Sequence, residues 1–543
     1  MSLRPIEDVS DELGLSRAHL RPHGLHKAKV ELAAIGAPLG KLVAVSAITP
    51  TPAGEGKTTV SVALAMGLRR LGVSAVPCLR EPSLGPVFGI KGGGTGGGRA
   101  TVEPQTAINL HFTGDIHAVG AAHNLLAALV DNALHFGGPC RIDPRFVTWP
   151  RVLDVNDRAL RDVVVGLGGE GVTRQARFEI TAASEVMAAL CLAESLADLK
   201  VRLGRLVVGR DAAGEDVTAA DIGATEAMAA LLADALRPNL VQTVEGGPAL
   251  VHGGPFANIA HGCSSSLATR LAMTHADVAI TEGGFGFDLG GEKLLDIKCR
   301  AAGIWPSLVL VVATLRALKW HGGVKKGAAG DPDQAALRAG LANLDAHLDA
   351  IGEFGLPAMV ALNRFEGDPE SELDVVRAHC EARGVEVALC DGFARGGEGA
   401  EALAGRVWDA IGDVEPPAPR FLYALDASYP EKIEAIATRV YGADGVDLDR
   451  DARRALERFD ARSPGLPVCV AKTYRSLSDD RSKRGRPTGF RVQVRDARLS
   501  AGAGFVVALL GDVMTMPGLP HEPAALSVRV LDDGTIRGLM SGE

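Results

Sequence analysis

The segment 49–59 reads Thr-Pro-Thr-Pro-Ala-Gly-Glu-Gly-Lys-Thr-Thr and lies between two apolar runs, at 42–48 and 60–68. This order predicts a strand, a phosphate-binding loop and a helix. Backbone N–H groups of such a loop can surround a polyphosphate, Lys57 adds a mobile positive charge, and the Thr58 hydroxyl can bind Mg²⁺. We therefore expect the chain to bind a nucleoside triphosphate.

The candidate nucleotide-binding residues of this loop are Thr51, Pro52, Ala53, Gly54, Glu55, Gly56, Lys57 and Thr58. The usual pattern opens with glycine six residues before the lysine, and this chain has Thr51 at that position. The alternative is an ordinary glycine-containing turn between a strand and a helix, with Lys57 on the surface.

Arg80 and Glu81 directly follow an apolar run at 75–79. A planar guanidinium suits a carboxylate or a phosphoryl oxygen better than an ammonium does, so Arg80 is a candidate catalytic residue that grips a small anionic substrate. Glu81 joins Thr58 as a candidate Mg²⁺ ligand, since this ion prefers oxygen ligands. The alternative is an Arg80–Glu81 ion pair on a solvated loop.

Asp115 lies in a segment that places polar side chains among apolar ones. With His111 or His117 it could act as a general base or bind Mg²⁺ through water, so it is a further catalytic candidate. A helix with satisfied polar side chains would explain the same residues equally well.

Phe365 and Phe393 each follow an apolar run, at 358–362 and 385–389, in a chain with only 4% aromatic residues. Two flat rings at neighbouring strand ends could hold an adenine or a pterin ring between them. Two ordinary core phenylalanines are the alternative.

Six of the seven residues from 92 to 98 are glycine. Neither a core helix nor a strand would tolerate this composition, so we expect a loop. Its backbone could lie close to a ligand or to another subunit, or the loop could simply be mobile on the surface.

The elements that must position these residues follow from the alternation of apolar runs with helical patterns. The strand-like runs are 42–48, 75–79, 278–281, 308–313, 358–362 and 385–389. Continuous apolar strands separated by helices predict an α/β fold with a parallel sheet covered on both faces. Such sheets bind ligands at the carboxyl ends of their strands, which here carry Arg80, Glu282, Asn363, Phe365 and Phe393.

A proline-rich break at 415–419 and a strand-rich end of the chain indicate more than one domain. We expect a phosphate-loop domain with the parallel sheet at 1–341 and two smaller α/β domains. The second, at 342–458, would line the ring pocket, and the third, at 459–543, would be a small C-terminal domain.

Composition narrows the class of protein. With 543 residues, of which 47% are hydrophobic, the chain can build a large core. A net charge of −9 and the lack of a long basic block argue against nucleic acid as a partner. The eight cysteines include no Cys-x-x-Cys pair, so we expect buried thiols in a reducing compartment rather than zinc ligands or disulfides.

The N-terminus and the apolar runs bear on the location of the protein. Residues 1–8 include Glu7 and Asp8 where a signal peptide would have an apolar core, and the longest apolar runs are only of strand length. We therefore expect a cytoplasmic protein that does not associate with a membrane.

Taken together, several long motifs resemble those of the formate–tetrahydrofolate ligase family. The resemblance runs from about Ile6 to the C-terminus, and its motifs are 49–59, 79–86, 109–115, 252–263 and 511–520. It implies a ligase that forms a C–N bond between formate and tetrahydrofolate, with ATP consumed through formyl phosphate and 10-formyltetrahydrofolate, ADP and phosphate as products.

The resemblance also implies cofactors, partners and residue roles. ATP with Mg²⁺ and tetrahydrofolate as co-substrate are expected, a monovalent cation is left open, and family members are homotetramers. Lys57 and Thr58 would hold the phosphates and Mg²⁺, and Arg80 would grip formate or formyl phosphate. Phe365 and Phe393 would line the ring pocket.

This chain departs from the usual family sequence at several positions. Phe393 replaces a tryptophan, Arg99 replaces the tyrosine that ends the glycine loop, and Thr106 and Ala107 replace two carboxylates. The usual Lys-Thr-Gln-Tyr-Ser reads 472–476 Lys-Thr-Tyr-Arg-Ser, which places Tyr474 where the family has glutamine. The phosphate loop is thus intact, whereas the surroundings of the second substrate are altered.

Two alternatives to the ligase remain. One keeps ATP-dependent activation of an acid but changes the acid or the acceptor, as the altered positions would allow. The other is a nucleotide-binding protein that has lost catalysis, against which the presence of Lys57, Thr58 and Arg80 argues.

Overall fold

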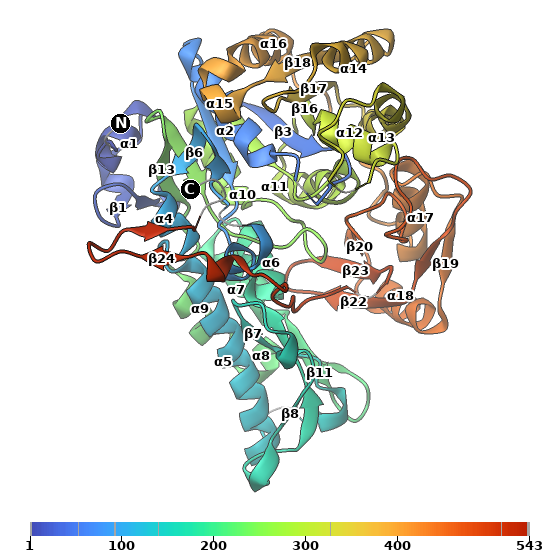
Figure 1. The fold of residues 1–543 in the computed structure, drawn as a ribbon. Helices are drawn as coiled ribbons and strands as arrows, with labels where there is room; N and C mark the ends of the chain where they lie inside the picture. The colour runs from blue at the N-terminus through green and yellow to red at the C-terminus, as the bar shows by residue number, and fades with distance from the viewer. Residues whose placement is uncertain are drawn as a thin grey trace.

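The computed structural model describes residues 3–52, 54–91, 94–138, 141–325, 327–511 and 513–539. Its centre is a large sheet with the strand order β1-β2-β13-β14-β4-β15-β3-β16-β17-β18, in which the short β6 pairs with β13 and β5 pairs with β6 (Figure 1). The strands are β1 (Leu20–Pro22), β2 (Ala28–Val30), β3 (Lys41–Ala47), β4 (Ala75–Leu79), β5 (Gly96–Gly97), β6 (Ala100–Glu103), β13 (Asn239–Thr243), β14 (Pro248–Val251), β15 (Val278–Glu282), β16 (Leu308–Ala313), β17 (Ala358–Asn363) and β18 (Glu386–Cys390).

The part of the sheet from β14 to β18 is parallel. In the register Val45 of β3 lies opposite Glu282 of β15 on one side and Leu310 of β16 on the other. The strands β1, β2, β13 and β6 add an antiparallel edge. The predicted α/β class and the predicted strands are confirmed, with ends that differ by at most one residue.

Helices cover both faces of this sheet, as the continuous apolar strands predict. In β3, Val43 and Val45 pack on the face covered by α2 and α16, whereas Leu42 and Ala44 pack on the opposite face, with α10 and α13. The covering helices are α1 (Ile6–Glu12), α2 (Lys57–Arg70), α10 (Ser266–His275), α12 (Leu315–His321), α13 (Gln334–Glu353), α14 (Glu370–Ala382), α15 (Gly392–Arg395) and α16 (Glu401–Ile411).

An arm, residues 115–232, extends away from the sheet along the long helix α5 (Figure 1). Its core packs α5 against α6, α7 and α9. The helices of the arm are α5 (Asp115–Phe136), α6 (Glu185–Leu192), α7 (Leu196–Gly204), α8 (Ala219–Ile222) and α9 (Thr225–Leu232), and its strands are β7 (Arg151–Leu153), β8 (Val163–Val165), β9 (Arg174–Ala176), β10 (Phe178–Ile180), β11 (Val207–Arg210) and β12 (Asp216–Thr218). The short helices α3 (Leu84–Pro86), α4 (Gln105–Asn109) and α11 (Arg300–Ala302) lie outside the arm.

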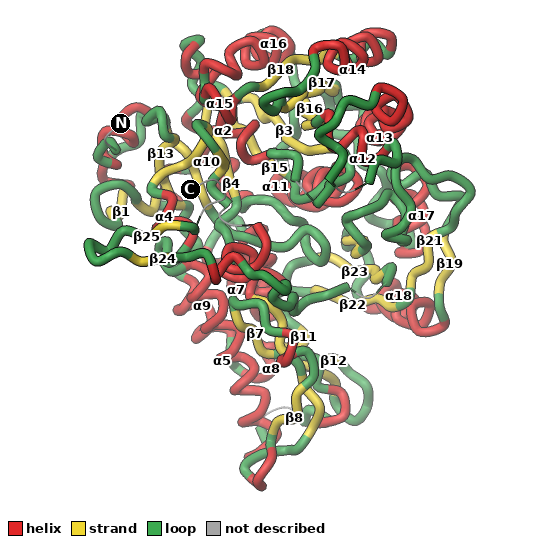
Figure 2. Tube along the Cα trace, viewed as in Figure 1, coloured by secondary structure: helices red, strands yellow, loops and turns green. Residues whose placement is uncertain are grey.

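A C-terminal lobe, residues 429–511, packs beside the sheet and carries two small sheets of its own (Figure 2). After it the chain runs back across the molecule, and the turn Ala524–Leu526 packs against Val87–Lys91. The elements are α17 (Tyr429–Arg439), α18 (Arg450–Arg462), β19 (Val446–Leu448), β20 (Val468–Ala471), β21 (Val492–Val494), β22 (Asp496–Ser500), β23 (Phe505–Leu509), β24 (Arg529–Val530) and β25 (Ile536–Arg537).

The predicted domain limits fall inside helices. Helix α13 runs across the limit at 341, and α18 runs across the limit at 458. The central sheet also takes β17 and β18 from the segment expected to form the second domain. The division of the chain into three domains stays a prediction.

The expectations for the cysteines and for membrane-spanning segments can be compared with the structure. Seven of the cysteines are free and buried, as expected, whereas Cys140 lies outside the described residues. Within the described ranges, none of the helices is both long enough and apolar enough to cross a membrane.

Candidate functional site

The predicted phosphate loop joins β3 to α2, and the helix begins at Lys57. Gly54 and Gly56 both have φ of +77°, a left-handed conformation that favours glycine. Glu55 fixes the loop from inside, because its Oε1 accepts a hydrogen bond from the N–H of Thr51 at 2.7 Å. Ala53, part of the predicted loop, lies outside the described residues.

The end of β17 supports the same loop. Asn363 donates from Nδ2 to the carbonyl oxygen of Glu55 at 3.0 Å. A Cβ on Gly56 would lie only 2.5 Å from that nitrogen, so the close approach requires glycine at this position. The strand-end residue thus holds the loop in shape before any ligand arrives.

Thr58 and Glu282 come together at the start of α2. The Thr58 hydroxyl lies 3.0 and 3.1 Å from the two carboxylate oxygens of Glu282, the last residue of β15. A hydroxyl and a carboxylate in this arrangement are suitable ligands for Mg²⁺, which takes oxygen ligands and keeps several from phosphates and water. The described residues contain no group of three or more His, Cys, Asp or Glu that could hold a metal ion by themselves.

Arg80 follows β4, the neighbour of β15, and is half-buried. Its Nη1 donates to the carbonyl oxygen of Pro255 at 3.3 Å, and its buried Nε has no hydrogen-bond partner within the described part of the chain. A Cβ on Gly284 would lie 3.2 Å from Nη1. The guanidinium therefore lies against a loop that carries no side chain at the point of contact.

Glu81 lies in a buried group of charges rather than at Thr58. Burial and the neighbouring Asp115 carboxylate raise the pKa of Glu81 well above its usual range, and Lys29 opposes this shift. Its Oε2 has no hydrogen-bond partner among the described residues. The residue that contacts the Thr58 hydroxyl is thus Glu282, and the assignment of Glu81 to the metal stays a prediction without a recorded contact.

Asp115 is the first residue of α5, and both of its carboxylate oxygens are bonded. Lys29 Nζ lies 2.6 Å from Oδ1 in a fully buried ion pair, and Asn239 Nδ2 donates to Oδ2 at 2.8 Å. His111 and His117 are exposed, and within the described residues neither histidine has a recorded hydrogen bond to Asp115. This geometry favours a role for Asp115 in fixing Lys29 beside Glu81, and its role as a base stays a prediction.

Phe365 and Phe393 follow neighbouring strands, β17 and β18, as predicted. The Arg316 guanidinium lies 4.4 Å from the centre of the Phe365 ring. Phe393 is half-exposed and contacts the glycine loop, because the N–H of Arg99 donates to the Phe393 carbonyl oxygen at 2.8 Å. The structure thus brings both rings to the same edge of the sheet.

The described part of the glycine loop packs against Phe393 and α2. A Cβ on Gly97 would lie 3.2 Å from the Phe393 ring and 3.5 Å from the Thr59 hydroxyl, and one on Gly98 would overlap the Phe393 carbonyl oxygen at 2.1 Å. The absence of side chains is therefore needed for this contact. Gly92 and Gly93 lie outside the described residues.

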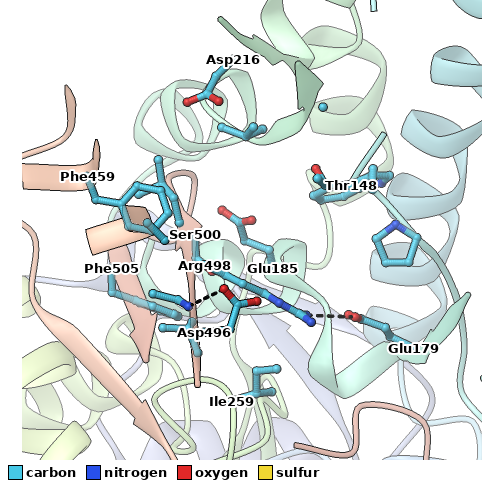
Figure 3. Close-up of a pocket in the computed structure, with 18 of the residues that line it drawn as sticks. Thr148, Glu179, Glu185, Asp216, Ile259, Phe459, Asp496, Arg498, Ser500 and Phe505 are labelled. Atoms are coloured by element: carbon cyan, nitrogen blue, oxygen red, sulfur yellow. Dashed lines mark hydrogen bonds and ion pairs between the residues drawn. The ribbon is translucent and has the colours of Figure 1, made fainter. Parts of the chain in front are cut away.

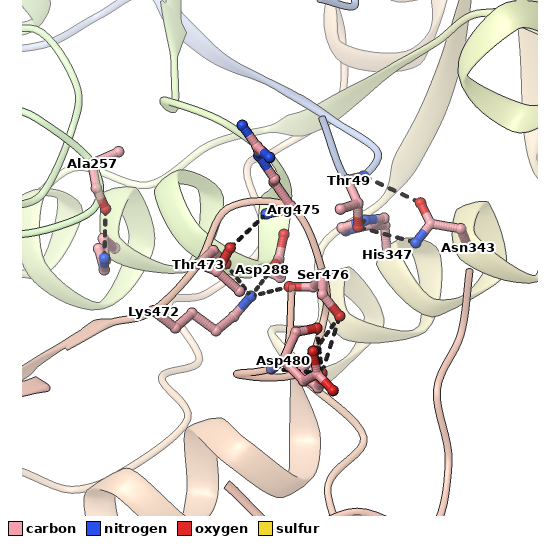
Figure 4. Close-up of polar contacts among 12 residues, drawn as sticks. Thr49, Ala257, Asp288, Asn343, His347, Lys472, Thr473, Arg475, Ser476 and Asp480 are labelled. Atoms are coloured by element: carbon pink, nitrogen blue, oxygen red, sulfur yellow. Dashed lines mark hydrogen bonds and ion pairs between the residues drawn. The ribbon is translucent and has the colours of Figure 1, made fainter. Parts of the chain in front are cut away.

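Two sets of buried polar contacts join the C-terminal lobe to the segments that carry the site (Figure 4). Lys472 and Asp288 form a fully buried ion pair at 2.5 Å, which joins the lobe to the loop after β15. Thr49, the first residue of the phosphate loop segment, bonds His347 and Asn343, and Asn343 in turn donates to the carbonyl oxygen of Gly485 at 2.8 Å.

A separate cavity of about 490 Å³ lies between the arm and the C-terminal lobe (Figure 3). It is lined by charges of both signs, among them Glu179, Glu185, Asp496 and Arg498, and by apolar side chains such as Phe505. Its described lining includes no residue of the phosphate loop, so it is distinct from the site described above.

Comparison with known proteins places the chain in a family. The model of the family described as formate–tetrahydrofolate ligase matches residues 1–540. The chain belongs to the formate–tetrahydrofolate ligase family. Relatives with that name share 58% identity in Myxococcus xanthus, over all of both chains, and 55% in Symbiobacterium thermophilum, over 99% of this chain and 98% of the relative. The relative from Paracoccus denitrificans is 53% identical over 98% of this chain and 97% of its own length.

Several positions at which we expect this chain to depart from the usual motifs of the formate–tetrahydrofolate ligase family lie close to candidate site residues. Arg99 and Phe393 bond each other through their backbones, and Thr106 and Ala107 lie in the adjoining helix α4. Tyr474 stacks on Phe285, three residues after Glu282. Sequence analysis placed Glu282 and Asn363 at strand ends but gave them no role, because their partners lie 224 and 308 residues away in the chain.

Proposed function

We propose that this protein ligates formate to tetrahydrofolate at the expense of ATP, which gives 10-formyltetrahydrofolate, ADP and phosphate. The observation that carries this proposal is the match of nearly the whole chain to the ligase family. The intact loop at Lys57, the Thr58–Glu282 contact and Arg80 at adjoining strand ends support it.

In the first step, a formate oxygen attacks the terminal phosphorus of ATP and the bond to the β,γ-bridging oxygen breaks, so that ADP leaves and formyl phosphate forms. Such a transfer needs position and neutralised charge more than covalent help from the protein. The loop amides and Lys57 would hold the phosphates, and Arg80 would hold the formate carboxylate in line. Arg80 suits this role because its Nε has no hydrogen-bond partner among the described residues.

In the second step, the N10 amine of tetrahydrofolate attacks the formyl carbon, the C–O bond to phosphate breaks, and the amine loses a proton. Arg80 would then hold the departing phosphate, whose charge grows as the bond breaks. Asp115 and Lys29 would fix the charges behind Arg80 and Glu81, where a buried ion pair is insulated from solvent.

Thr58 and Glu282 would hold Mg²⁺ beside the β- and γ-phosphates. The ion would supply neutralisation of phosphate charge when bound. Phe365 and Phe393 would take the flat ring of a substrate against the open edge of the sheet. A monovalent cation, a homotetrameric assembly and a cytoplasmic location stay predictions from the family resemblance and the sequence.

The test is formation of 10-formyltetrahydrofolate with ADP release from ATP, Mg²⁺, formate and tetrahydrofolate, beside reactions that lack each substrate. Product that requires all three substrates supports the ligase. Formate-dependent ADP release without a folate product would point to another acceptor. Intact ATP binding without any turnover would contradict the proposal and favour a protein that has lost catalysis.

A further inference from the structure

The cavity of about 490 Å³ between the arm and the C-terminal lobe has no part in the mechanism above (Figure 3). Five arginines are among its lining residues: the arm provides Arg177 and Arg210, and the lobe provides Arg454, Arg458 and Arg498. Guanidinium groups from two parts of the chain therefore meet at one cavity. Like charges that are partly removed from water repel each other, so groups in this position need counter-ions.

One pair of these arginines has a counter-ion from the protein itself. Arg177, which directly precedes β10, donates from Nε to Glu179 Oε1 at 3.1 Å. Arg498 of β22 reaches the same oxygen from the lobe, with its Nη1 at 3.9 Å, and Figure 3 shows this contact. A single carboxylate thus lies between a guanidinium of the arm and a guanidinium of the lobe.

A second pair, Arg210 of the arm and Arg458 of the lobe, has no such bridge. Arg210 ends β11 and lies 5.6 Å from the centre of the Phe146 ring, and Arg458 of α18 lies 5.0 Å from that of Phe459. Within the described residues, neither guanidinium has a recorded ion pair, and the buried Nε of Arg458 has no hydrogen-bond partner. Burial and then the charge of Arg210 lower the pKa of Arg458, so the two positive charges affect each other.

The lining holds four further carboxylates, and in the described part of the chain none of them has a recorded ion pair with Arg210 or Arg458: Glu185, Asp216, Asp451 and Asp496. Glu185 accepts two backbone N–H groups of the lobe, and Asp496 accepts the N–H of the next residue at 2.8 Å. Asp216 and Asp496 favour the charged form of Arg458, but each does so less strongly than Arg210 opposes it. The counter-ion of this pair must therefore come from outside the described chain.

We propose that the cavity binds the phosphate group of a ligand between Arg210 and Arg458, in the way that Glu179 lies between the other two arginines. A tetrahedral phosphate can present oxygens to guanidinium groups on two sides, whereas a carboxylate has only two oxygens in one plane. A phosphate monoester carries a charge of about −1.5 to −2 at pH 7, which neutralises two guanidinium groups. The described lining includes no residue of the phosphate loop, so this site does not depend on the proposed reaction.

The cavity has room for an organic group beside the phosphate. Its volume falls within the range of about 300–1,000 Å³ that is usual for small-molecule sites. Part of its wall is apolar, where Ile259, Phe459 and Phe505 line it (Figure 3). The class of ligand that fits is a phosphomonoester of a small metabolite, which would join the arm to the lobe.

Isothermal titration calorimetry with inorganic phosphate and with glycerol 3-phosphate, at constant ionic strength, tests this site. We expect binding to weaken about tenfold or more in Arg210→Gln and in Arg458→Gln, because each variant loses charge-assisted hydrogen bonds. Arg453→Gln is the matched control, since Arg453 is an exposed arginine of the same helix that does not line the cavity. Asp216→Asn removes a negative charge from the lining and should tighten binding, which damage to the fold would not do.

Hydrogen exchange provides a second readout, because the ligand would join the two parts of the chain. The N–H groups of Gly502 and Ala503 donate to Glu185 across the same interface. Glycerol 3-phosphate should slow their exchange in the wild type and not in Arg210→Gln. Unchanged exchange in the ligand-bound wild type would contradict a bridge between arm and lobe.

Arg80→Gln distinguishes this cavity from the reaction site, where phosphate is a product of the proposed reaction. Binding in the cavity should persist in Arg80→Gln. Binding that is lost in Arg80→Gln but kept in Arg210→Gln and Arg458→Gln overturns the inference, and so does an equal loss in Arg453→Gln or a lack of binding at millimolar concentrations of both probes. Tighter binding of glycerol 3-phosphate than of inorganic phosphate supports a phosphomonoester as the ligand, and the reverse order supports free phosphate at the same two arginines.

Discussion

At the scale of single residues, the contact between Thr58 and Glu282 favours Glu282 over Glu81 as the carboxylate of the proposed Mg²⁺ site. Glu282 lies within 3.1 Å of the hydroxyl that follows the loop lysine, whereas Glu81 lies among Lys29, Asp115 and Asp154. We predict that Glu282→Gln raises the Mg²⁺ concentration needed for half-maximal rate at least tenfold, because one negative ligand is lost. Titration of the rate with MgCl₂ measures this.

Glu81→Gln is the matched control, since it makes the same substitution in the residue that follows Arg80. The Thr58 hydroxyl contacts Glu282, and no contact with Glu81 is seen among the described residues, so the Mg²⁺ dependence of Glu81→Gln should stay close to that of the wild type. A larger Mg²⁺ shift in Glu81→Gln than in Glu282→Gln would restore the assignment of Glu81 to the metal.

Lys57 is the first residue of α2, and we propose that it supplies a positive charge to the nucleotide phosphates. We predict that Lys57→Ala lowers kcat by about 10²- to 10³-fold, which corresponds to about 3–4 kcal/mol of lost stabilisation of the phosphoryl oxygens. Steady-state product formation measures the loss, and unchanged thermal stability shows that the fold is intact. Turnover near that of the wild type would overturn the phosphate-loop assignment.

Lys57 and Thr58 could be assigned to the phosphate loop from the sequence, because they follow it directly in the chain. Glu282 and Asn363 could not be assigned in this way, since their contacts depend on the order of strands in the sheet. That β15 lies next to β3, and that β17 lies two strands from it, is decided by packing and not by any local pattern. The stacked partner of Phe285 lies farther still, in the C-terminal lobe.

At the scale of elements, the glycine loop depends on the contact between Gly98 and Phe393. A Cβ on Gly98 would overlap the Phe393 carbonyl oxygen, and φ is +58°. We predict that Gly98→Ala forces the loop away from Phe393 and raises the KM of at least one ring-bearing substrate, ATP or tetrahydrofolate, severalfold. Initial rates with each substrate varied in turn measure this.

Gly72→Ala supplies the control, because Gly72 also has a left-handed φ, +83°, and its Cβ would meet no described atom within 4 Å. Both changes carry the backbone strain of about 1–2 kcal/mol that a Cβ adds in this conformation. Only Gly98→Ala should change a KM. Equal effects of the two variants on the KM values would show that the loop contact is unimportant for binding.

The central strands were predictable for a physical reason. A parallel strand buried on both faces must be apolar throughout, as β16 is from Leu308 to Ala313. The arm could not be predicted from the sequence, because its strands β7 to β12 have only three or four residues each. An alternation of apolar and polar residues cannot be recognised over so short a length. The predicted domain limit at 341 lies between β16 and β17 of the one central sheet, and the division of the chain into domains stays a prediction.

At the scale of the whole molecule, the C-terminal lobe is joined to the site by the Lys472–Asp288 pair. Both side chains are almost fully buried, so Lys472→Ala leaves a carboxylate unpaired in the interior. We predict a loss of about 3–5 kcal/mol in unfolding free energy. Arg462→Ala, which breaks the exposed pair with Glu215 between the same lobe and the arm, should cost under about 1 kcal/mol in the same urea titration. Equal losses of unfolding free energy in the two variants would show that the buried pair stabilises the protein no more than the exposed pair does.

The arm and the C-terminal lobe are also joined by Glu185, and this contact makes their packing sensitive to pH. Glu185 Oε1 accepts the N–H of Gly502 at 2.8 Å and that of Ala503 at 3.3 Å. Burial raises the pKa of Glu185 from 4.5 to about 7, although these two hydrogen bonds oppose the shift. The folded protein therefore keeps a proton that the unfolded chain releases between pH 4.5 and about 7.

This raised pKa means that the contribution of Glu185 to stability is full below about pH 4.5 and is lost as the pH rises through about 7. Glu185→Gln keeps an acceptor oxygen but does not titrate. Buried histidines such as His123, whose pKa burial lowers to about 3, add an opposite pH dependence to both proteins. The difference in unfolding free energy, wild type minus Glu185→Gln, isolates Glu185, and we predict that it falls by up to about 3 kcal/mol between pH 4.5 and pH 8. Urea unfolding across this range measures the difference. A difference that stays constant with pH would mean that Glu185 has the same pKa in the folded and unfolded chain. Protonation of Glu185 would then not contribute to the packing of the lobe on the arm.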